Sequence, residues 1–121
     1  MLATDAPLLP TQLKRLARRA AMGLARNGSY AGNGSGDIFI AFSTANPGTG
    51  QHATTDRISM LGNDEIDPLF IAAVDATEEA IVNAMIAAET MTGNGGFRAV
   101  AIDHDALRNV LKQYGRLLPG K

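Results

Sequence analysis

The segment from Asp67 to about Met91 constrains the fold most, because its apolar residues occupy more than one side of a helix. Asp67 and Pro68 suit the N-cap and the first helical turn, and the run Gly93-Asn94-Gly95-Gly96 is predicted to end the helix. A helix that is apolar on two sides must be covered on two sides. The larger apolar residues of the segment are Leu69, Phe70, Ile71, Val74, Ile81, Val82, Met85 and Ile86.

A second helix is predicted from about residue 11 to residue 26. Pro10 fits its first turn, and the pair Asn27-Gly28 offers a left-handed residue at its end. Lysine and arginine side chains lie opposite the apolar stripe, as on an ordinary solvated face. The stripe repeats with the period of an amphipathic helix at Leu13, Leu16, Ala17, Ala20 and Leu24.

The remaining elements alternate with these helices. A strand is predicted over residues 37–44 and appears covered on both faces, because Ile38 and Phe39 begin two apolar sets that alternate along it. Residues 97–102 are predicted to form a short strand or extended segment. Residues 104–114 are predicted to form a last helix whose inward-facing residues are Leu107, Val110, Leu111 and Tyr114. Residues 45–64 read as a loop with a possible strand at 57–61, and the chain opens without a strong element. This order predicts a single α/β layer domain over residues 1–121, short of strands and completed by further protein.

The composition excludes several classes of function. The 121 residues are 45% hydrophobic and 19% charged, carry a formal net charge of −1 and contain no cysteine. Neither nucleic acid nor a membrane is therefore an expected partner, and thiolate chemistry is excluded. His52 and His104 lack the spacing of a zinc site and are interpreted as polar surface residues. The first residues lack the features of a signal peptide, so we expect a cytoplasmic location.

The run Asn33-Gly34-Ser35-Gly36-Asp37 is the strongest candidate site. Its glycines permit positive φ and a close approach of another chain. The simpler interpretation is a turn in which Asn33 and Ser35 satisfy backbone groups. A phosphate cradle is disfavoured, because a strand rather than a helix follows and Asp37 would repel an anion.

A hydrolytic site is the alternative interpretation of this run. Ser35 and Asp37 are two residues apart near the expected strand start, so their side chains would point the same way and the acid could orient the hydroxyl. No histidine is placed to act as the base. A free α-amine, as in enzymes that expose an N-terminal Ser or Thr by self-cleavage, is the other sensible base.

Three blocks in order carry a resemblance to a known family. They read ATDAPLLP at 3–10, QLKRLARRAA at 12–21 and GNGSGDIFIAFSTAN at 32–46. These blocks resemble the β-subunit of the L-aminopeptidase/D-esterase family, the serine aminopeptidases that include the β-peptidyl aminopeptidases. The likeness extends through the chain to its C-terminus.

The resemblance implies a proenzyme that cleaves itself between a glycine and a serine. The α- and β-chains would then form an αββα sandwich and oligomerise, here with an incomplete half of helix-strand-helix-strand-helix order. The new N-terminal serine would attack the carbonyl of a peptide, amide or ester substrate and form an acyl-enzyme. By residue-level match, Ser35 would orient that nucleophile and Asp37 would hold charge near an amine, with Asn33, Gly34 and Gly36 shaping the turn. No metal or other cofactor is implied.

One departure from the family pattern concerns the nucleophile. In the family the nucleophilic serine opens an apolar strand immediately before the ATDAPLLP block, whereas only Met1 and Leu2 precede that block here. We therefore expect the 121 residues to be inactive without the missing serine and the α-subunit. The alternative function is a non-catalytic binding or assembly module that uses the basic face of residues 11–26, and salt-sensitive binding would reveal it.

Overall fold

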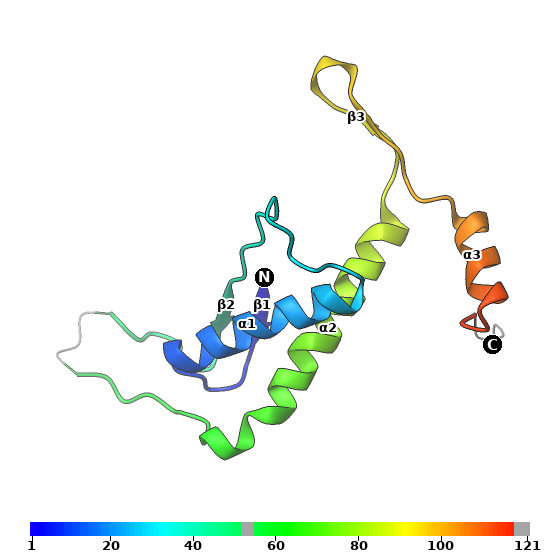
Figure 1. Cartoon of the computed structure of the whole chain (residues 1–121). Helices are drawn as coiled ribbons and strands as arrows, with labels where there is room; N and C mark the ends of the chain where they lie inside the picture. The colour runs from blue at the N-terminus through cyan, green and yellow to red at the C-terminus, as the bar shows by residue number, and fades with distance from the viewer. Residues whose placement is uncertain (52–54, 118–121) are drawn as a thin grey trace. The chain divides into compact units, whose positions relative to one another are not determined.

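The computed structural model describes residues 1–51 and 55–117, which form two compact units, Met1–Ala80 and Ile81–Lys121 (Figure 1). The α/β character predicted from the sequence is confirmed, with helices and small sheets alternating along the chain. A single domain over residues 1–121 stays a prediction. No helix in the described ranges is long and apolar enough to cross a membrane.

Helix α1 spans Pro10–Arg26 and confirms the predicted amphipathic helix. Its buried residues fall on one face, at Gln12, Leu16, Ala20 and Gly23. At the N-terminus the Gln12 Oε1 atom accepts a hydrogen bond from the backbone N–H of Leu9 at 2.9 Å. This bond satisfies one of the donors that a helix start leaves without an intrahelical partner.

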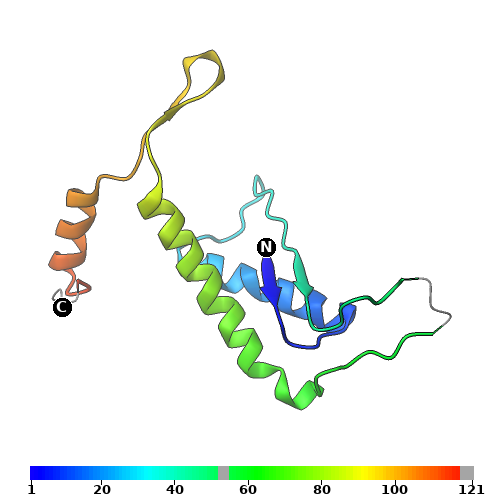
Figure 2. The ribbon, with the colours of Figure 1, turned by 180° about the vertical axis from the view of Figure 1, so that it is seen from behind.

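A parallel pair of strands lies beside α1 (Figure 2). Strand β1 spans Leu2–Thr4 and strand β2 spans Ala41–Ser43, with Ala3 opposite Phe42. The sequence predicts no strong element at the chain start, whereas pairing with β2 makes a short strand of Leu2–Thr4. The prediction of a strand from residue 37 is also too long, since the ladder begins only at residue 41.

The predicted covering of both faces of this strand is not present within the chain. Ile40 and Phe42 keep 52% and 42% of their surface exposed. Two strands and one adjacent helix do not supply enough protein to cover both faces. The alternation of apolar residues therefore predicted the position of the strand. It did not predict which of these residues are buried by the described part of the chain.

Helix α2 spans Asp67–Ala87 and follows a short 3-10 turn at Asn63–Glu65. Its N-terminal half contributes to the main core of the first unit, where Ile66 is only 1% exposed. The predicted burial on two sides is not found, since Ile71 on the same helix is 61% exposed. The core cluster consists of Leu8, Leu16, Ile66, Phe70 and Ala73.

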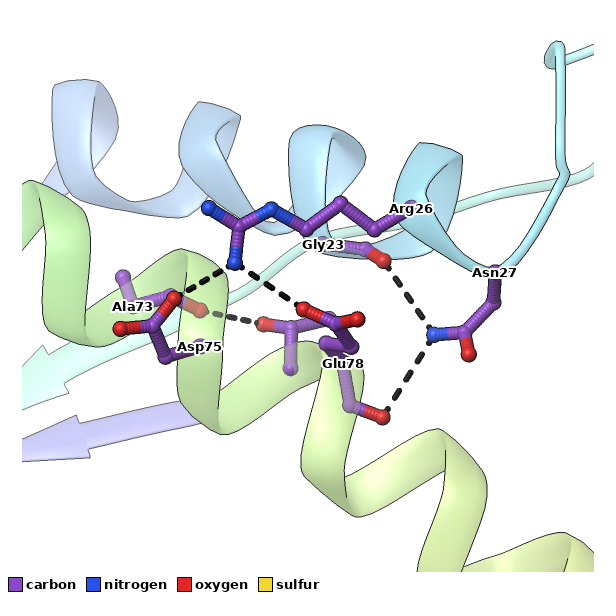
Figure 3. Close-up of polar contacts among 7 residues, drawn as sticks. Gly23, Arg26, Asn27, Ala73, Asp75 and Glu78 are labelled. Carbon is purple, nitrogen blue, oxygen red and sulfur yellow. Dashed lines mark hydrogen bonds and ion pairs between the residues drawn. The ribbon is translucent and has the colours of Figure 1, made fainter. Parts of the chain in front are cut away.

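The helices α1 and α2 cross closely at Gly23 (Figure 3). A Cβ atom at this position would lie 2.5 Å from the backbone oxygen of Val74 and 2.7 Å from Cβ of Thr77. Only glycine allows the backbones to approach in this way. The crossing fixes the end of α1, from which the candidate site departs.

The second unit contains a hairpin and a helix. Strands β3 (Met91–Thr92) and β4 (Arg98–Ala99) pair antiparallel around a 3-10 turn at Asn94–Gly96, and α3 spans His104–Gln113. Helix α2 ends before the predicted Met91 because this residue pairs with Ala99 instead. The last helix is confirmed, and its N-cap is the Asp103 carboxylate, which accepts from two backbone N–H groups.

Three further expectations differ from the structure. Residues 57–61 form no strand among the described residues. The extended segment expected over residues 97–102 pairs only at Arg98 and Ala99. Val110 and Tyr114, expected to face inward from the last helix, are 51% and 71% exposed. The last helix is thus formed as its periodicity predicts, but none of the described residues of the second unit covers its apolar side.

Candidate active site

The glycine run folds as a turn that is closed by one backbone hydrogen bond. The N–H of Ser35 donates to the carbonyl oxygen of Gly32 at 2.8 Å. The segment then continues without regular structure to residue 40 and enters β2 at Ala41. The turn therefore leads into the strand through the irregular residues 36–40 and not directly, as the sequence had suggested.

The hydroxyl of Ser35 donates a hydrogen bond to the carboxylate of Asp37. The two side chains thus point toward each other, as the spacing of two residues predicts. Both residues are exposed, and Asp37 forms no ion pair with any residue of the described ranges. The carboxylate keeps lone pairs free to bind a cation, while the Ser35 oxygen can still accept a hydrogen bond.

The glycines on either side of Ser35 are not in left-handed conformations. A Cβ atom at Gly34 or Gly36 would meet nothing within 4 Å, and the positive φ of this segment belongs to Ala31, at 50°. Gly34 and Gly36 therefore do not use the positive φ that glycine permits. Their small size leaves both sides of Ser35 open, and Asn33 beside them is exposed.

A recess of about 480 Å³ lies beside the Ser35–Asp37 pair. One wall is the C-terminal half of α1, and the other is the segment of residues 29–39. Its volume lies in the range of about 300–1,000 Å³ that is usual for small-molecule sites. The lining residues are Ala21, Leu24, Ala25, Ser29, Tyr30, Ala31, Gly32, Ser35, Asp37 and Phe39.

Polar contacts fix the end of α1, where this segment begins (Figure 3). The Asn27 side-chain amide donates to the carbonyl oxygens of Gly23 and Glu78 at 3.3 and 3.5 Å. The Arg26 guanidinium lies 2.6 Å from the Asp75 carboxylate and 3.0 Å from that of Glu78. The hydrogen bonds with Asp75 and then Glu78 are the main cause that raises the pKa of Arg26.

Sequence reasoning placed Arg26 on a solvated basic face and missed this contact. Its partners are 49 and 52 residues away in the chain, so no local pattern indicates them. Two other arginines of the same face are also engaged, because the guanidinium groups of Arg15 and Arg19 lie 5.2 and 4.1 Å from the centre of the Phe70 ring. Part of this basic face therefore makes contacts within the first unit.

No group of three or more histidine, aspartate and glutamate side chains in the described part of the chain is arranged to hold a metal ion. His104 Nε2 lies 2.9 Å from the carbonyl oxygen of Ile86, so its contact is with the backbone. His52 lies outside the described residues. The chemistry that the site offers is therefore that of a hydroxyl, a carboxylate and an adjoining apolar recess.

The model of peptidase family S58 matches residues 1–99. The chain belongs to this family. Its resemblance to the L-aminopeptidases and β-peptidyl aminopeptidases is thereby confirmed, since family S58 relatives of both kinds match it.

The family S58 relatives match almost all of this chain. The β-peptidyl aminopeptidase BapA of Sphingosinicella microcystinivorans is 50% identical over 123 residues, which include 100% of this chain and 31% of that protein. The L-aminopeptidase D-Ala-esterase/amidase of Ochrobactrum anthropi superposes with a TM-score of 0.84 and 55% identity, over 94% of this chain and 32% of that one. The β-aminopeptidase of a Burkholderia species gives a TM-score of 0.81 and 42% identity, over 96% and 35% of the two chains.

Two conclusions follow from these matches. The Ochrobactrum structure is described as a prototype for the serine aminopeptidases and a new variant among the Ntn hydrolase fold, so this chain has Ntn-hydrolase-like structural neighbours. The chain also spans only about a third of the length of these relatives. The 121 residues therefore match one portion of these longer relatives.

Proposed function

We propose that this chain is the portion of a serine aminopeptidase that supplies the orienting serine and its acid. The hydrogen bond from Ser35 to Asp37 carries the proposal, because it joins the two residues that the family resemblance selects. Membership of a peptidase family supports the reaction class. The substrates would be peptides, amides or esters with a free N-terminal amine.

In this mechanism the nucleophile is an N-terminal serine from a part of the enzyme outside the matched third. Its hydroxyl attacks the substrate carbonyl, the amine or alcohol leaves with a proton, and water later hydrolyses the acyl-enzyme. The Ser35 hydroxyl donates a hydrogen bond to Asp37, so its oxygen is free to accept a hydrogen bond from the nucleophile. The negative charge of Asp37 would stabilise a nearby ammonium group.

Completion of the fold by further protein is part of the same proposal. The exposed apolar residues along the segment before β2 and on α2 support an αββα sandwich whose other layers come from an α-subunit and the rest of the β-subunit. Burial of such residues is the main favourable contribution to association. Self-cleavage, oligomers of αβ units and inactivity of the 121 residues alone belong to the proposal as well.

The alternative of a binding module on the basic face of α1 is less well supported. Arg15 and Arg19 lie over Phe70, and Arg26 is paired with two carboxylates, so these charges are not free for a polyanion. If the module existed, it would bind a polyanion such as heparin with an affinity that falls steeply with salt.

A chimera tests the proposal directly. Residues 1–121 replace the matching third of the Ochrobactrum enzyme, and hydrolysis of a D-alanine amide is measured. Ser35→Ala should lower kcat by at least about 100-fold, the lower end for a group that takes part in proton transfer. Asp37→Asn should also lower the rate, because it removes the charge beside the reacting groups.

Matched controls separate these roles from folding. Ser59→Ala and Asp64→Asn change an exposed serine and an exposed aspartate outside the site, and both should leave the rate unchanged. A folded chimera that hydrolyses the amide equally well with Ser35→Ala would refute the proposed role of Ser35. Turnover by the isolated 121 residues would refute their dependence on the rest of the enzyme.

A further inference from the structure

The recess beside Ser35 has one polar and one apolar side. Ala21, Leu24 and Ala25 lie on one face of α1, since they are three and four residues apart. Ser35 and Asp37 lie on the opposite wall. A ligand that fits both walls must carry a polar or cationic group next to a compact apolar group.

Tyr30 occupies an unusual position at this recess. It is 91% exposed, although a tyrosine ring is a large apolar surface. Its ring lies against Gly32, where an added Cβ atom would be 3.0 Å from the Tyr30 Cε2 atom. The absence of a side chain at Gly32 therefore allows the ring to hold this position beside the pair of catalytic candidates.

The segment that carries Tyr30 is tied to α1 by backbone contacts. The N–H of Ser29 donates to the carbonyl oxygen of Leu24 at 3.4 Å, and the Ser29 hydroxyl accepts from the N–H of Ala31 at 3.3 Å. Tyr30 lies between these two anchored residues. The backbone at Tyr30 is therefore held near the end of α1, although the ring itself is exposed.

We propose that this recess is the side-chain subsite of the proposed aminopeptidase site and that Tyr30 is its specificity-determining wall. The inference rests on the proposed function and adds the substrate class. The recess would accept a residue with a small apolar side chain, which contacts Tyr30 and Leu24 while its protonated amine pairs with Asp37. An ammonium group near the Tyr30 ring would gain a further favourable contact.

The test measures binding to the complete 121-residue chain by NMR titration of its ¹⁵N-labelled form. The probes are L-leucinamide, glycinamide, which lacks the side chain, and N-acetyl-L-leucinamide, which lacks the cation. Leucinamide should shift the amide signals of the recess and bind at least about 5-fold more tightly than glycinamide, given the apolar area it buries. The acetylated probe should bind more weakly than leucinamide, because it cannot pair with Asp37.

Variants test whether the preference for leucinamide over glycinamide depends on Tyr30. Tyr30→Ala should reduce the leucinamide-to-glycinamide ratio by about 2- to 5-fold, whereas Tyr30→Phe should preserve it because the ring remains. Gly32→Ala should lower the ratio less than Tyr30→Ala does, since the new Cβ would be 3.0 Å from Tyr30 Cε2 and moves the ring without removing it. Tyr114→Ala is the matched control, because this second exposed tyrosine lies outside the recess and should leave the ratio unchanged.

The outcomes distinguish the subsite from the proposed function. Equal binding of leucinamide and glycinamide, or an unchanged ratio in Tyr30→Ala, would overturn the subsite even if the chimera requires Ser35 for hydrolysis. Selective leucinamide binding that depends on Tyr30 would support the subsite. If the chimera nevertheless hydrolysed its substrate without Ser35, the proposed function would fail, and the recess would be an amine-binding site unconnected with that reaction.

Discussion

A side chain at Gly23 would collide with the backbone of Val74, because an added Cβ atom would lie 2.5 Å from the Val74 carbonyl oxygen. This contact belongs to the crossing of α1 and α2 and involves backbone rather than a flexible side chain. The helices must therefore separate if position 23 gains a Cβ atom. The crossing also orients the end of α1, where the candidate site begins.

Gly23→Ala is expected to destabilise the chain by about 1–3 kcal/mol, the usual cost of overpacking a close contact. Alanine has a higher helix propensity than glycine, so the loss of stability would come from the close contact and not from helix propensity. Urea unfolding followed by circular dichroism measures the change. Gly62→Ala is the matched control, because nothing lies within 4 Å of its added Cβ atom and its φ of −58° suits any residue.

Arg26→Gln is expected to lower the urea midpoint at low ionic strength. The hydrogen bonds with Asp75 and Glu78 raise the pKa of Arg26, so its stabilising charge is complete at neutral pH and is lost only as pH rises through a strongly alkaline value. The difference between variant and parent should therefore not change from neutral to mildly alkaline pH. It should shrink at about 1 M salt, where the Debye length is about 3 Å.

Lys14→Gln provides the control for this prediction. Lys14 is also exposed on α1 but forms no ion pair with the residues that the structure describes. Its replacement should change the midpoint little at either ionic strength. A salt-independent loss in Arg26→Gln would show that the arginine acts through packing rather than charge.

Gln12→Leu is expected to cost about 1–3 kcal/mol, because it removes the partners of the Leu9 N–H and the Leu61 carbonyl oxygen at a partly buried position. The Gln12 Nε2 atom donates to the Leu61 carbonyl oxygen at 2.9 Å and to Asn63 Oδ1 at 3.2 Å. Gln113→Leu, on the exposed face of α3, is the control and should be nearly neutral.

Gln12→Glu tests the direction of the same hydrogen bonds. The introduced carboxyl would face two acceptors in a buried position, so its pKa should lie above that of the unfolded chain. A raised pKa contributes stability at acidic pH that is lost as pH increases through the folded value. The difference in urea midpoint from the parent should therefore be smaller at acidic than at neutral pH, and a difference that is the same at both would contradict the assignment.

Local sequence patterns predicted the helices more accurately than the strands. The bounds of α1 follow from Pro10, Asn27 and Gly28, which act within one turn of the chain. The start of β1 and the length of β2 depend on pairing across about 40 residues, which no local pattern reports. Met91 left the predicted helix for a different reason, because it pairs with Ala99 in a short hairpin that turns at Asn94–Gly96.

The candidate site was predictable to a similar extent. Spacing placed Ser35 beside Asp37, and the structure brings them together. The partners of Arg26 were not predictable, because they lie 49 and 52 residues away in the chain. The recess and the position of Tyr30 were missed because they depend on how the irregular segment after α1 folds back beside that helix, which no periodic pattern describes. Apolar periodicity also overstated burial, since Phe42 and Ile71 lie on sides that were predicted to be covered and stay 42% and 61% exposed.

The last prediction concerns Ile71→Glu, which tests whether Ile71 is covered by another layer in the complete enzyme. Ile71 is 61% exposed on α2, so in the isolated chain the charge should change the urea midpoint little. In the chimera with the Ochrobactrum enzyme, the same change should lower the thermal midpoint if another layer covers this face, because a buried unpaired carboxylate is costly. Glu79→Gln, at an exposed position of the same helix, is the control. Equal stability of the Ile71→Glu and parent chimeras would show that this face of α2 stays in contact with solvent.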